Sequence, residues 1–233
     1  MFRRSSPPVG AVLAVLVVAV VVVAATACGR DSDPASAAQP PVRKITVAGD
    51  SISVGLGSEL RTVVGDRATV KVIGEVGSGL ARPDTFDWPT RLQQLAREFP
   101  PSVLVFSVGS NDAQDLTDAA GATVVTRADP DWDAEYSRRL AAAFDAFKGT
   151  DTTVVWVGHV RTAEARVGQT NRKIHRLAVE VAADRPWVQV ADLGELLGTG
   201  ERTATACLRP DGLHLTVECL QQADTALAPQ LLG

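Results

Sequence analysis

Five residues of this chain have the types that serine-based acyl chemistry requires. Ser51 offers a hydroxyl nucleophile, His214 offers a base, and Asp211 offers a carboxylate that could orient the histidine. A serine hydroxyl attacks poorly until a neighbouring base takes its proton, and that base needs a third group to hold its ring. Gly79 and Asn111 could donate N–H groups to the oxyanion that forms during the attack. The set therefore predicts an enzyme that cleaves or transfers acyl groups.

Each of these residues also has a simpler explanation. Ser51 could merely cap a helix after Asp50, because serine is common at helix starts. Gly79 could be an ordinary loop glycine, Asn111 a turn residue, and His214 a capping residue that follows an Asp-Gly turn. No residue is decisive alone, so the prediction depends on whether the fold brings the residues together.

The two other histidines have weaker functional patterns. His175 falls on the flank of a helical apolar stripe, which favours a surface or packing role. His159 follows a predicted strand and could contact substrate. With three histidines and none at ligand spacing from a cysteine pair, the sequence predicts no metal site. The proposed chemistry also needs no cofactor.

Apolar runs alternate along the chain with helical patterns, which predicts an α/β fold whose parallel sheet is covered on both faces. Strands are predicted at 44–48, 68–73, 102–108, 152–157 and 187–191, and helices at 53–64, 88–99, 131–148, 169–183 and 217–227.

The candidate residues all follow predicted strands. Ser51 follows the first strand, Gly79 the second, Asn111 the third, and Asp211 and His214 the fifth. In open parallel sheets, functional sites form beyond the carboxyl ends of the strands. We therefore expect these residues to meet at one edge of the sheet.

Two loops at this edge could also face a substrate. The loop after Gly79 carries Arg82, Asp84 and Trp88, which could form a wall of an acyl or sugar pocket. The alternative is a loop held by an Arg–carboxylate pair and a packed tryptophan. Residues 113–130 form a long polar segment that could be a lid or an ordinary surface excursion.

The N-terminus is predicted to be a targeting signal, over residues 1–27. Two arginines precede an uncharged apolar run at 9–27, and small residues then lead to Cys28. This ending resembles a bacterial lipoprotein signal, in which Cys28 would be lipidated; an uncleaved signal anchor is the alternative. Residues 28–42 are predicted to be a disordered tether and 43–233 the folded domain. The domain is therefore expected to lie outside the cytoplasm, tethered to a membrane or secreted.

The net charge and the cysteine content limit the classes of function and the compartment that fit this chain. The formal net charge is −4 and no basic stripe is present beyond the helices, which disfavours nucleic-acid binding. Cys207 and Cys219 are expected to form a disulfide in an oxidising compartment, although two buried thiols remain the alternative. The bridge would enclose Asp211 and His214 and would stabilise the fold by about 3 kcal/mol.

The ordered motifs resemble those of the SGNH hydrolase superfamily, also called GDSL esterases. Gly49-Asp50-Ser51 matches its first block, Gly79 the glycine of its second, Gly109-Ser110-Asn111-Asp112 its third and Asp211-Gly212-Leu213-His214 its fifth. The resemblance covers about residues 44–227. It implies a flavodoxin-like three-layer α/β/α sandwich with a five-stranded parallel sheet, acyl-ester chemistry, and Ser51 as the nucleophile.

Residues 77–89 also resemble a bacterial envelope subgroup with a Gly-Leu-x-Arg-Pro-Asp-x-x-Asp-Trp-Pro signature. Where that subgroup often has Gly-Leu-Pro-Pro after the fourth strand, this chain has Gly158-His159-Val160-Arg161, so its substrate-facing edge is expected to differ. The sequence thus predicts an extracytoplasmic serine esterase acting on short acyl groups, such as acetyl groups on envelope polysaccharide. An acyltransferase that uses a sugar hydroxyl, or a glycan-binding lipoprotein without turnover, stays open as an alternative.

Overall fold

The computed structural model describes residues 42–233. The predicted targeting signal, Cys28 and the predicted tether, apart from Val42, lie outside the described residues. The described residues fall within the second of two units of the chain, Pro41–Gly233, and this second unit carries every candidate residue of the acyl chemistry. Within the described residues, no helix is both long enough and apolar enough to cross a bilayer.

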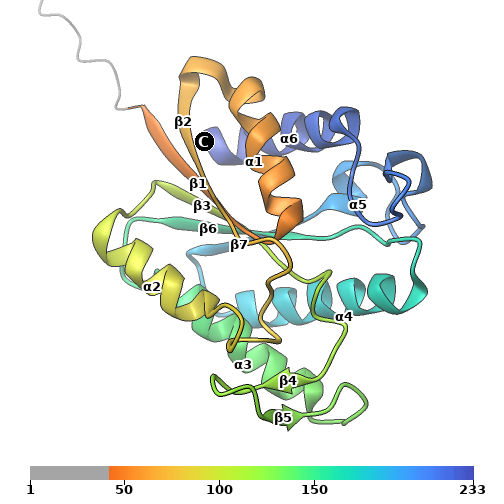
Figure 1. Cartoon of the computed structure of the whole chain (residues 1–233). Coiled ribbons are helices and arrows are strands. Elements are labelled where there is room, and N and C mark those ends of the chain that lie inside the picture. The colour runs from red at the N-terminus through yellow and green to blue at the C-terminus, as the bar shows by residue number, and fades with distance from the viewer. Residues whose placement is uncertain (1–41) are drawn as a thin grey trace, which may run out of the picture. The chain divides into compact units, whose positions relative to one another are not determined.

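The second unit is built on a five-stranded parallel sheet in the order β2-β1-β3-β6-β7 (Figure 1). The strands are β1 (Arg43–Gly49), β2 (Ala68–Gly74), β3 (Val103–Ser107), β6 (Thr153–Gly158) and β7 (Val188–Asp192). This is the flavodoxin-like order, in which the chain reverses its winding direction between β1 and β3 and leaves a crevice beyond their carboxyl ends. The predicted fold class is confirmed.

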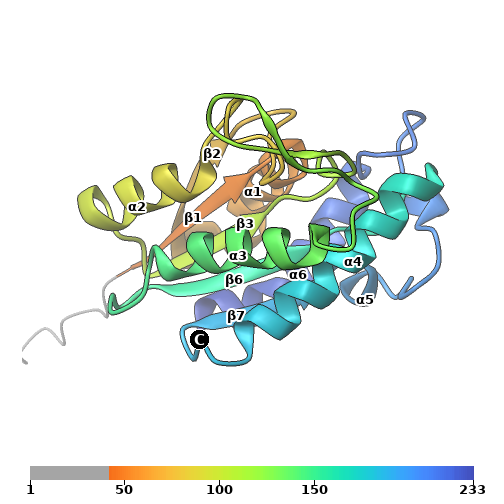
Figure 2. The same ribbon diagram turned by 90° about the horizontal axis from the view of Figure 1, so that it is seen from below.

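Helices cover both faces of the sheet and form three layers (Figures 1 and 2). On one face lie α1 (Ser51–Val64), α6 (Val217–Leu232) and the short α5 (Leu193–Leu196). On the other lie α2 (Trp88–Glu98), α3 (Trp132–Asp145) and α4 (Ala165–Ala182). The predicted helices are present, but α4 begins four residues earlier than the sequence pattern indicates.

The central strands show why the sequence reads as continuous apolar runs. On β3, Leu104 and Phe106 point into the core under α2, α3 and α4, whereas Val103 and Val105 point into the core under α1 and α6. Strand β6 alternates in the same way. Because both faces of the sheet are covered, neither set of side chains meets water, and the usual apolar–polar alternation is lost.

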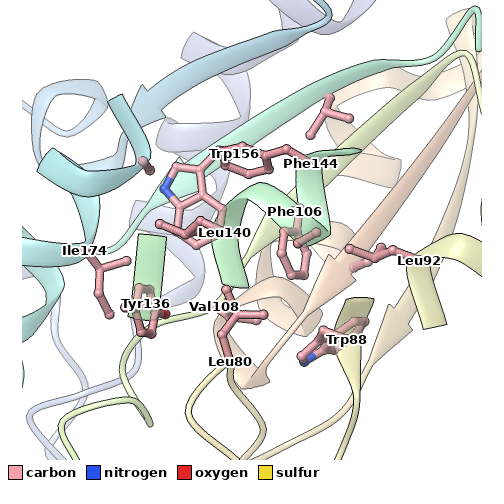
Figure 3. Close-up of a cluster of buried hydrophobic side chains, with 14 of the residues drawn as sticks. Leu80, Trp88, Leu92, Phe106, Val108, Tyr136, Leu140, Phe144, Trp156 and Ile174 are labelled. Atoms are coloured by element: carbon pink, nitrogen blue, oxygen red, sulfur yellow. The ribbon is translucent and has the colours of Figure 1, made fainter. Parts of the chain in front are cut away.

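Aromatic side chains fill the core under α2 and α3 (Figure 3). Phe106 is in edge contact with both Trp88 and Trp156, with 5.5 Å between ring centroids in each pair. Phe144 also makes an edge contact with Trp156, with 5.8 Å between ring centroids. Such contacts add roughly 0.5–1.5 kcal/mol each beyond area burial. They fix α2 and α3 against the strand that leads to Asn111.

The polar segment at 113–130 contains a small antiparallel pair, β4 (Leu116–Thr117) and β5 (Thr123–Val125), which the sequence did not predict. Leu116 and Thr117 are buried, and the N–H of Thr117 donates to the carbonyl of Ala81 at 3.0 Å. The pair is missed because strands of two and three residues leave no periodic pattern. The segment is thus anchored to the neighbouring loop.

A buried carboxyl group on α6 gives a test of the fold. Asp224 is buried, and neither of its carboxyl oxygens has a hydrogen-bond partner in residues 42–233. Burial, and secondly repulsion from Glu59, raise its pKa to about 8, whereas an unfolded aspartate titrates near about 3.9. The folded state therefore binds more protons between these values, and the free energy of unfolding falls as the pH rises through them.

We expect Asp224→Asn to have a free energy of unfolding at pH 8.5 that is higher than that of the wild type by about 1 kcal/mol or more. This difference corresponds to roughly one pKa unit. The advantage should shrink as the pH falls towards 5, where Asp224 is protonated. Urea denaturation at pH 5, 7 and 8.5 would measure it, with Asp66→Asn as a control at an exposed carboxylate. Parallel stability–pH curves for wild type and Asp224→Asn would contradict the assignment.

Candidate active site

Ser51, His214 and Asp211 form a continuous hydrogen-bonded chain at the carboxyl edge of the sheet. His214 Nε2 lies 2.8 Å from Ser51 Oγ, and His214 Nδ1 lies 3.0 Å from Asp211 Oδ2. Both distances are within the range expected for a nucleophile, its base and an orienting carboxylate. With the Nδ1 proton donated to Asp211, Nε2 is free to accept the hydroxyl proton of Ser51.

The carboxylate of Asp211 is held ionised by the loop that carries it. Its Oδ1 accepts hydrogen bonds from the backbone N–H groups of His214 and Leu213, each at 2.9 Å. These bonds, followed by the bond to the His214 ring, lower the pKa of Asp211 to about 2. The Asp211 carboxylate therefore remains ionised near neutral pH and can accept the hydrogen bond from His214 there.

Ser51 is placed by a sharp turn from β1 into α1. Gly49 has φ +140°, and a Cβ atom there would lie 1.8 Å from the carbonyl oxygen of Ser107, so only glycine fits. Asp50 then caps the helix by accepting from the N–H of Ile52 at 2.9 Å. Ser51 is consequently the first residue of α1, where free N–H groups favour developing negative charge.

The histidine loop is held by covalent and backbone links. A disulfide joins Cys207 to Cys219, the pairing expected from the sequence. Between them the chain folds back on itself, because the Thr216 N–H donates to the Cys207 carbonyl at 2.8 Å and the Arg209 N–H donates to the His214 carbonyl at 2.7 Å. The loop is thereby a short antiparallel ribbon with a fixed end, which keeps the His214 ring over Ser51.

Three N–H groups at this edge of the sheet are candidate donors to an oxyanion. Within residues 42–233, the backbone N–H groups of Ser51 and Gly79 make no hydrogen bond, which leaves them available to an oxyanion. The Asn111 amide donates to the Ser78 carbonyl at 2.9 Å and more weakly to Asp50 Oδ2 at 3.4 Å. Asn111 can therefore turn to an oxyanion by releasing only the longer contact.

Asp112 fixes the position of Gly79, a role that sequence reasoning missed. Its fully buried carboxylate accepts from the N–H groups of Leu80 at 3.1 Å and Ala81 at 2.9 Å, and from the hydroxyl of Tyr136 at 2.6 Å. Burial raises the pKa of Asp112 to about 6, against these hydrogen bonds, which lower it. A Cβ atom on Gly79 would lie 2.0 Å from the carboxylate, so glycine is required there for close approach.

His159 lies beneath the site, with a side chain only 2% exposed. Its Nδ1 accepts from the Ser110 N–H at 3.2 Å, so Nε2 carries the proton and donates to Ser107 Oγ at 2.9 Å. Burial lowers its pKa to about 4, so the ring is neutral at pH 7 and its 3.8 Å approach to Asp50 is not an ion pair. This placement argues against the expected substrate contact and gives His159 a supporting position under the Asn111 turn.

The other two expected substrate contacts are also engaged within the protein. Trp88 has 0% exposure, packs on Phe106 and donates from Nε1 to Ser78 Oγ at 2.9 Å. Arg82 forms a two-bond pair with Asp84 at 2.9 and 2.6 Å. The loop is therefore held by an Arg–carboxylate pair and a packed tryptophan, and Trp88 offers no surface to a substrate.

A hollow of about 260 Å³ opens beside Ser51 and His214. Its apolar wall consists of Ile52, Val54, Val76, Leu215 and Leu220. A larger hollow of about 360 Å³ lies between α2, α3 and the β4–β5 pair, and Gly79 is its only residue from the site. The smaller hollow is therefore the one that borders the Ser51 hydroxyl. No group of three or more His, Cys, Asp or Glu side chains in the described part of the chain could hold a metal ion.

Substitution of Gly79 by alanine tests whether its N–H group is an oxyanion donor. The new methyl group would collide with Asp112, so the loop must shift and its N–H must leave the site. We expect kcat of ester hydrolysis to fall about 100-fold or more, in line with the loss of one oxyanion donor. Steady-state kinetics alongside thermal melts would measure this; unchanged kcat in a folded Gly79→Ala protein would remove Gly79 from the site.

Comparisons with known proteins identify the family of the chain. The family model described as "Protein of unknown function (DUF459)" matches residues 44–217. A search of curated proteins found no matching relative. Among solved structures, a protein described as an SGNH hydrolase from Slackia heliotrinireducens superposes with a TM-score of 0.59 at 17% identity, covering 81% of this chain and 98% of its own.

Two further structures share this fold. A carbohydrate acetylesterase family member from Sinorhizobium meliloti has a TM-score of 0.59 at 18% identity, covering 82% of this chain and 99% of its own. The catalytic domain of peptidoglycan O-acetyltransferase A from Streptococcus pneumoniae has a TM-score of 0.56 at 13% identity, covering 80% and 90%. The chain thus belongs to the family described as "Protein of unknown function (DUF459)", and its described unit has the fold of the SGNH hydrolases.

Proposed function

We propose that this protein is a serine esterase that cleaves acyl esters through an acyl-serine intermediate. The observation that carries the proposal is the chain from Ser51 through His214 to Asp211, with distances of 2.8 and 3.0 Å, at the start of α1. A serine that only capped a helix would need neither a histidine on its hydroxyl nor a carboxylate behind that histidine.

The reaction follows from the positions of these groups. Ser51 Oγ attacks the ester carbonyl carbon while its proton passes to His214 Nε2, and the N–H groups of Ser51 and Gly79 with the Asn111 amide receive the oxyanion. The bond from carbon to the alcohol oxygen then breaks, and His214 returns the proton to that oxygen. Water next loses a proton to His214 and attacks the acyl carbon. The bond to Ser51 Oγ breaks, Oγ regains a proton, and the carboxylic acid leaves.

The size of the neighbouring hollow favours short acyl groups. Its volume of about 260 Å³ is below the roughly 300–1,000 Å³ of pockets that hold drug-sized ligands. The proposed substrate is therefore a short acyl ester, such as an acetyl ester. Envelope polysaccharide as the alcohol is supported by the predicted targeting signal and by the fold shared with a carbohydrate acetylesterase family member.

An acyltransferase is a second candidate, since one structure with this fold is a peptidoglycan O-acetyltransferase. The acyl-serine intermediate would be the same, but a sugar hydroxyl would replace water in its breakdown. Mass spectrometry of products formed with and without oligosaccharide acceptors would separate the two: acylated sugar indicates transfer, and free acid alone indicates hydrolysis.

Removal of the Ser51 hydroxyl is the direct test. We expect Ser51→Ala to lose at least about 1,000-fold in kcat on p-nitrophenyl acetate while keeping its thermal stability, because removing any member of such a triad leaves only oxyanion and binding contributions. Labelling by a fluorophosphonate probe should also disappear, since the probe forms a bond to an activated serine.

Ser58→Ala is a matched control, because Ser58 is an exposed serine on the same helix. It should keep full activity and labelling. Full activity in Ser51→Ala would refute the mechanism. A folded wild type that neither labels nor turns over any ester would instead support a glycan-binding protein without catalysis.

Replacement of Asp211 by asparagine tests the role of the orienting carboxylate. An asparagine can still accept a backbone hydrogen bond, but its NH₂ group would face His214 Nδ1 and force the proton onto Nε2. We expect kcat to fall about 100- to 10,000-fold with little change in KM, because the wrong tautomer cannot take the serine proton. Activity within twofold of the wild type would show that His214 works without Asp211.

A further inference from the structure

The hollow beside the reactive serine contains one permanently charged side chain, Arg209. The rest of its wall is apolar apart from Ser51 and His214 themselves. A guanidinium presents a planar fork of N–H donors that fits carboxylate and phosphate groups. The positive charge of Arg209 can therefore influence which esters the site accepts. This inference rests on the proposed esterase activity.

The ribbon of the histidine loop fixes the face from which the Arg209 side chain projects. Leu208 and Leu215 form an antiparallel bridge, so Arg209 and His214 are the next residues directly opposite each other. Residues opposite each other in such a ribbon project from the same face, with Cβ atoms about 4.5–5.5 Å apart. The side chains of Arg209 and His214 thus start from neighbouring points on one face, and both line the hollow. The disulfide at Cys207 anchors the ribbon two residues away from Arg209.

The side chain of Arg209 is also uncommitted. Other arginines of the described unit, such as Arg82, Arg139 and Arg185, donate to carboxylates or carbonyls. Arg209 is exposed and makes no side-chain hydrogen bond or ion pair with any residue in 42–233. It therefore does nothing evident for the fold and has its donors free for a ligand.

The chemistry identifies the part of the substrate that Arg209 meets. His214 must reach the alcohol oxygen to protonate it as it leaves, so the alcohol lies on the histidine side of the ester carbonyl. Arg209 stands beside His214, whereas the oxyanion donors Gly79 and Asn111 come from the loops after β2 and β3. The cation therefore flanks the alcohol and not the carbonyl oxygen.

We propose that the substrate is an ester whose alcohol part carries a negative charge, a carboxylate or phosphate, and that Arg209 binds this group. Acidic sugars are alcohols of this class. The neutral apolar wall of the hollow then receives the uncharged part of the substrate, and Arg209 sets the preference among esters that Ser51 could attack.

The test compares two esters on the full-length chain: 4-acetoxybenzoate, with a charge on the alcohol side, and its neutral methyl ester. The measured quantity is the ratio of kcat/KM for the charged ester to that for the neutral ester. Because this ratio is compared between enzymes, the different intrinsic reactivities of the two esters cancel. We expect Arg209→Gln to lower the ratio about tenfold, mainly through KM, and Arg209→Lys to lower it less.

Arg97→Gln is the matched control, since it removes one exposed positive charge from the end of α2, away from the hollow. It should leave the ratio unchanged. Raising the salt concentration from 0.1 to 1 M should lower the wild-type ratio by screening the contact. An unchanged ratio in Arg209→Gln would overturn the inference while leaving the esterase intact, whereas absence of turnover of both esters by the wild type would refute the proposed function itself.

Discussion

The site depends most on one buried carboxylate, that of Asp112. It joins three parts of the chain that are distant in sequence: the turn after β3, the loop after β2 through Leu80 and Ala81, and α3 through Tyr136. A buried charge is costly unless hydrogen bonds replace the lost water, and here three donors do so. These hydrogen bonds fix the position of the Gly79 loop, which must stay against the Asn111 turn to keep them.

This constraint explains why the packing behind the site matters for its chemistry. Tyr136 belongs to the core under α3, and Trp88, which packs on Phe106, donates to Ser78 next to Gly79. The apolar core thus holds the proposed oxyanion donors from behind, while His159 supports the Asn111 turn from below through Ser110. Oxyanion donors act well only when they need no reorganisation during the reaction. A close-packed core and a satisfied buried carboxylate both provide that rigidity.

The features that local sequence patterns encode were predicted: the strands, the helices and the positions of the candidate residues after the strands. The five strands were found because buried parallel strands are apolar runs, and Ser51, Asn111 and His214 were placed at one edge because they follow such runs. The role of Asp112 was not predicted, because its partners Ala81 and Leu80 lie 31 and 32 residues away. The same limit applies to Trp88 and His159. Their residue types suit substrate contact, but burial, which no spacing reveals, places them inside.

The two halves of the site are held by different means, and the reason is their burial. Ser51 and Asn111 lie on turns shortly after the buried strands β1 and β3, and Asp112 ties the Gly79 loop to the second of these turns, so the core positions all three. Asp211 is exposed and His214 half-buried, on a loop long after β7. Here the disulfide and the paired backbone of the ribbon add to the buried contacts of Cys207 and Leu215. Because the same ribbon carries Arg209, the links that hold His214 over Ser51 also hold the backbone of Arg209 opposite it, so the proposed catalysis and the proposed choice of alcohol would both depend on one rigid loop.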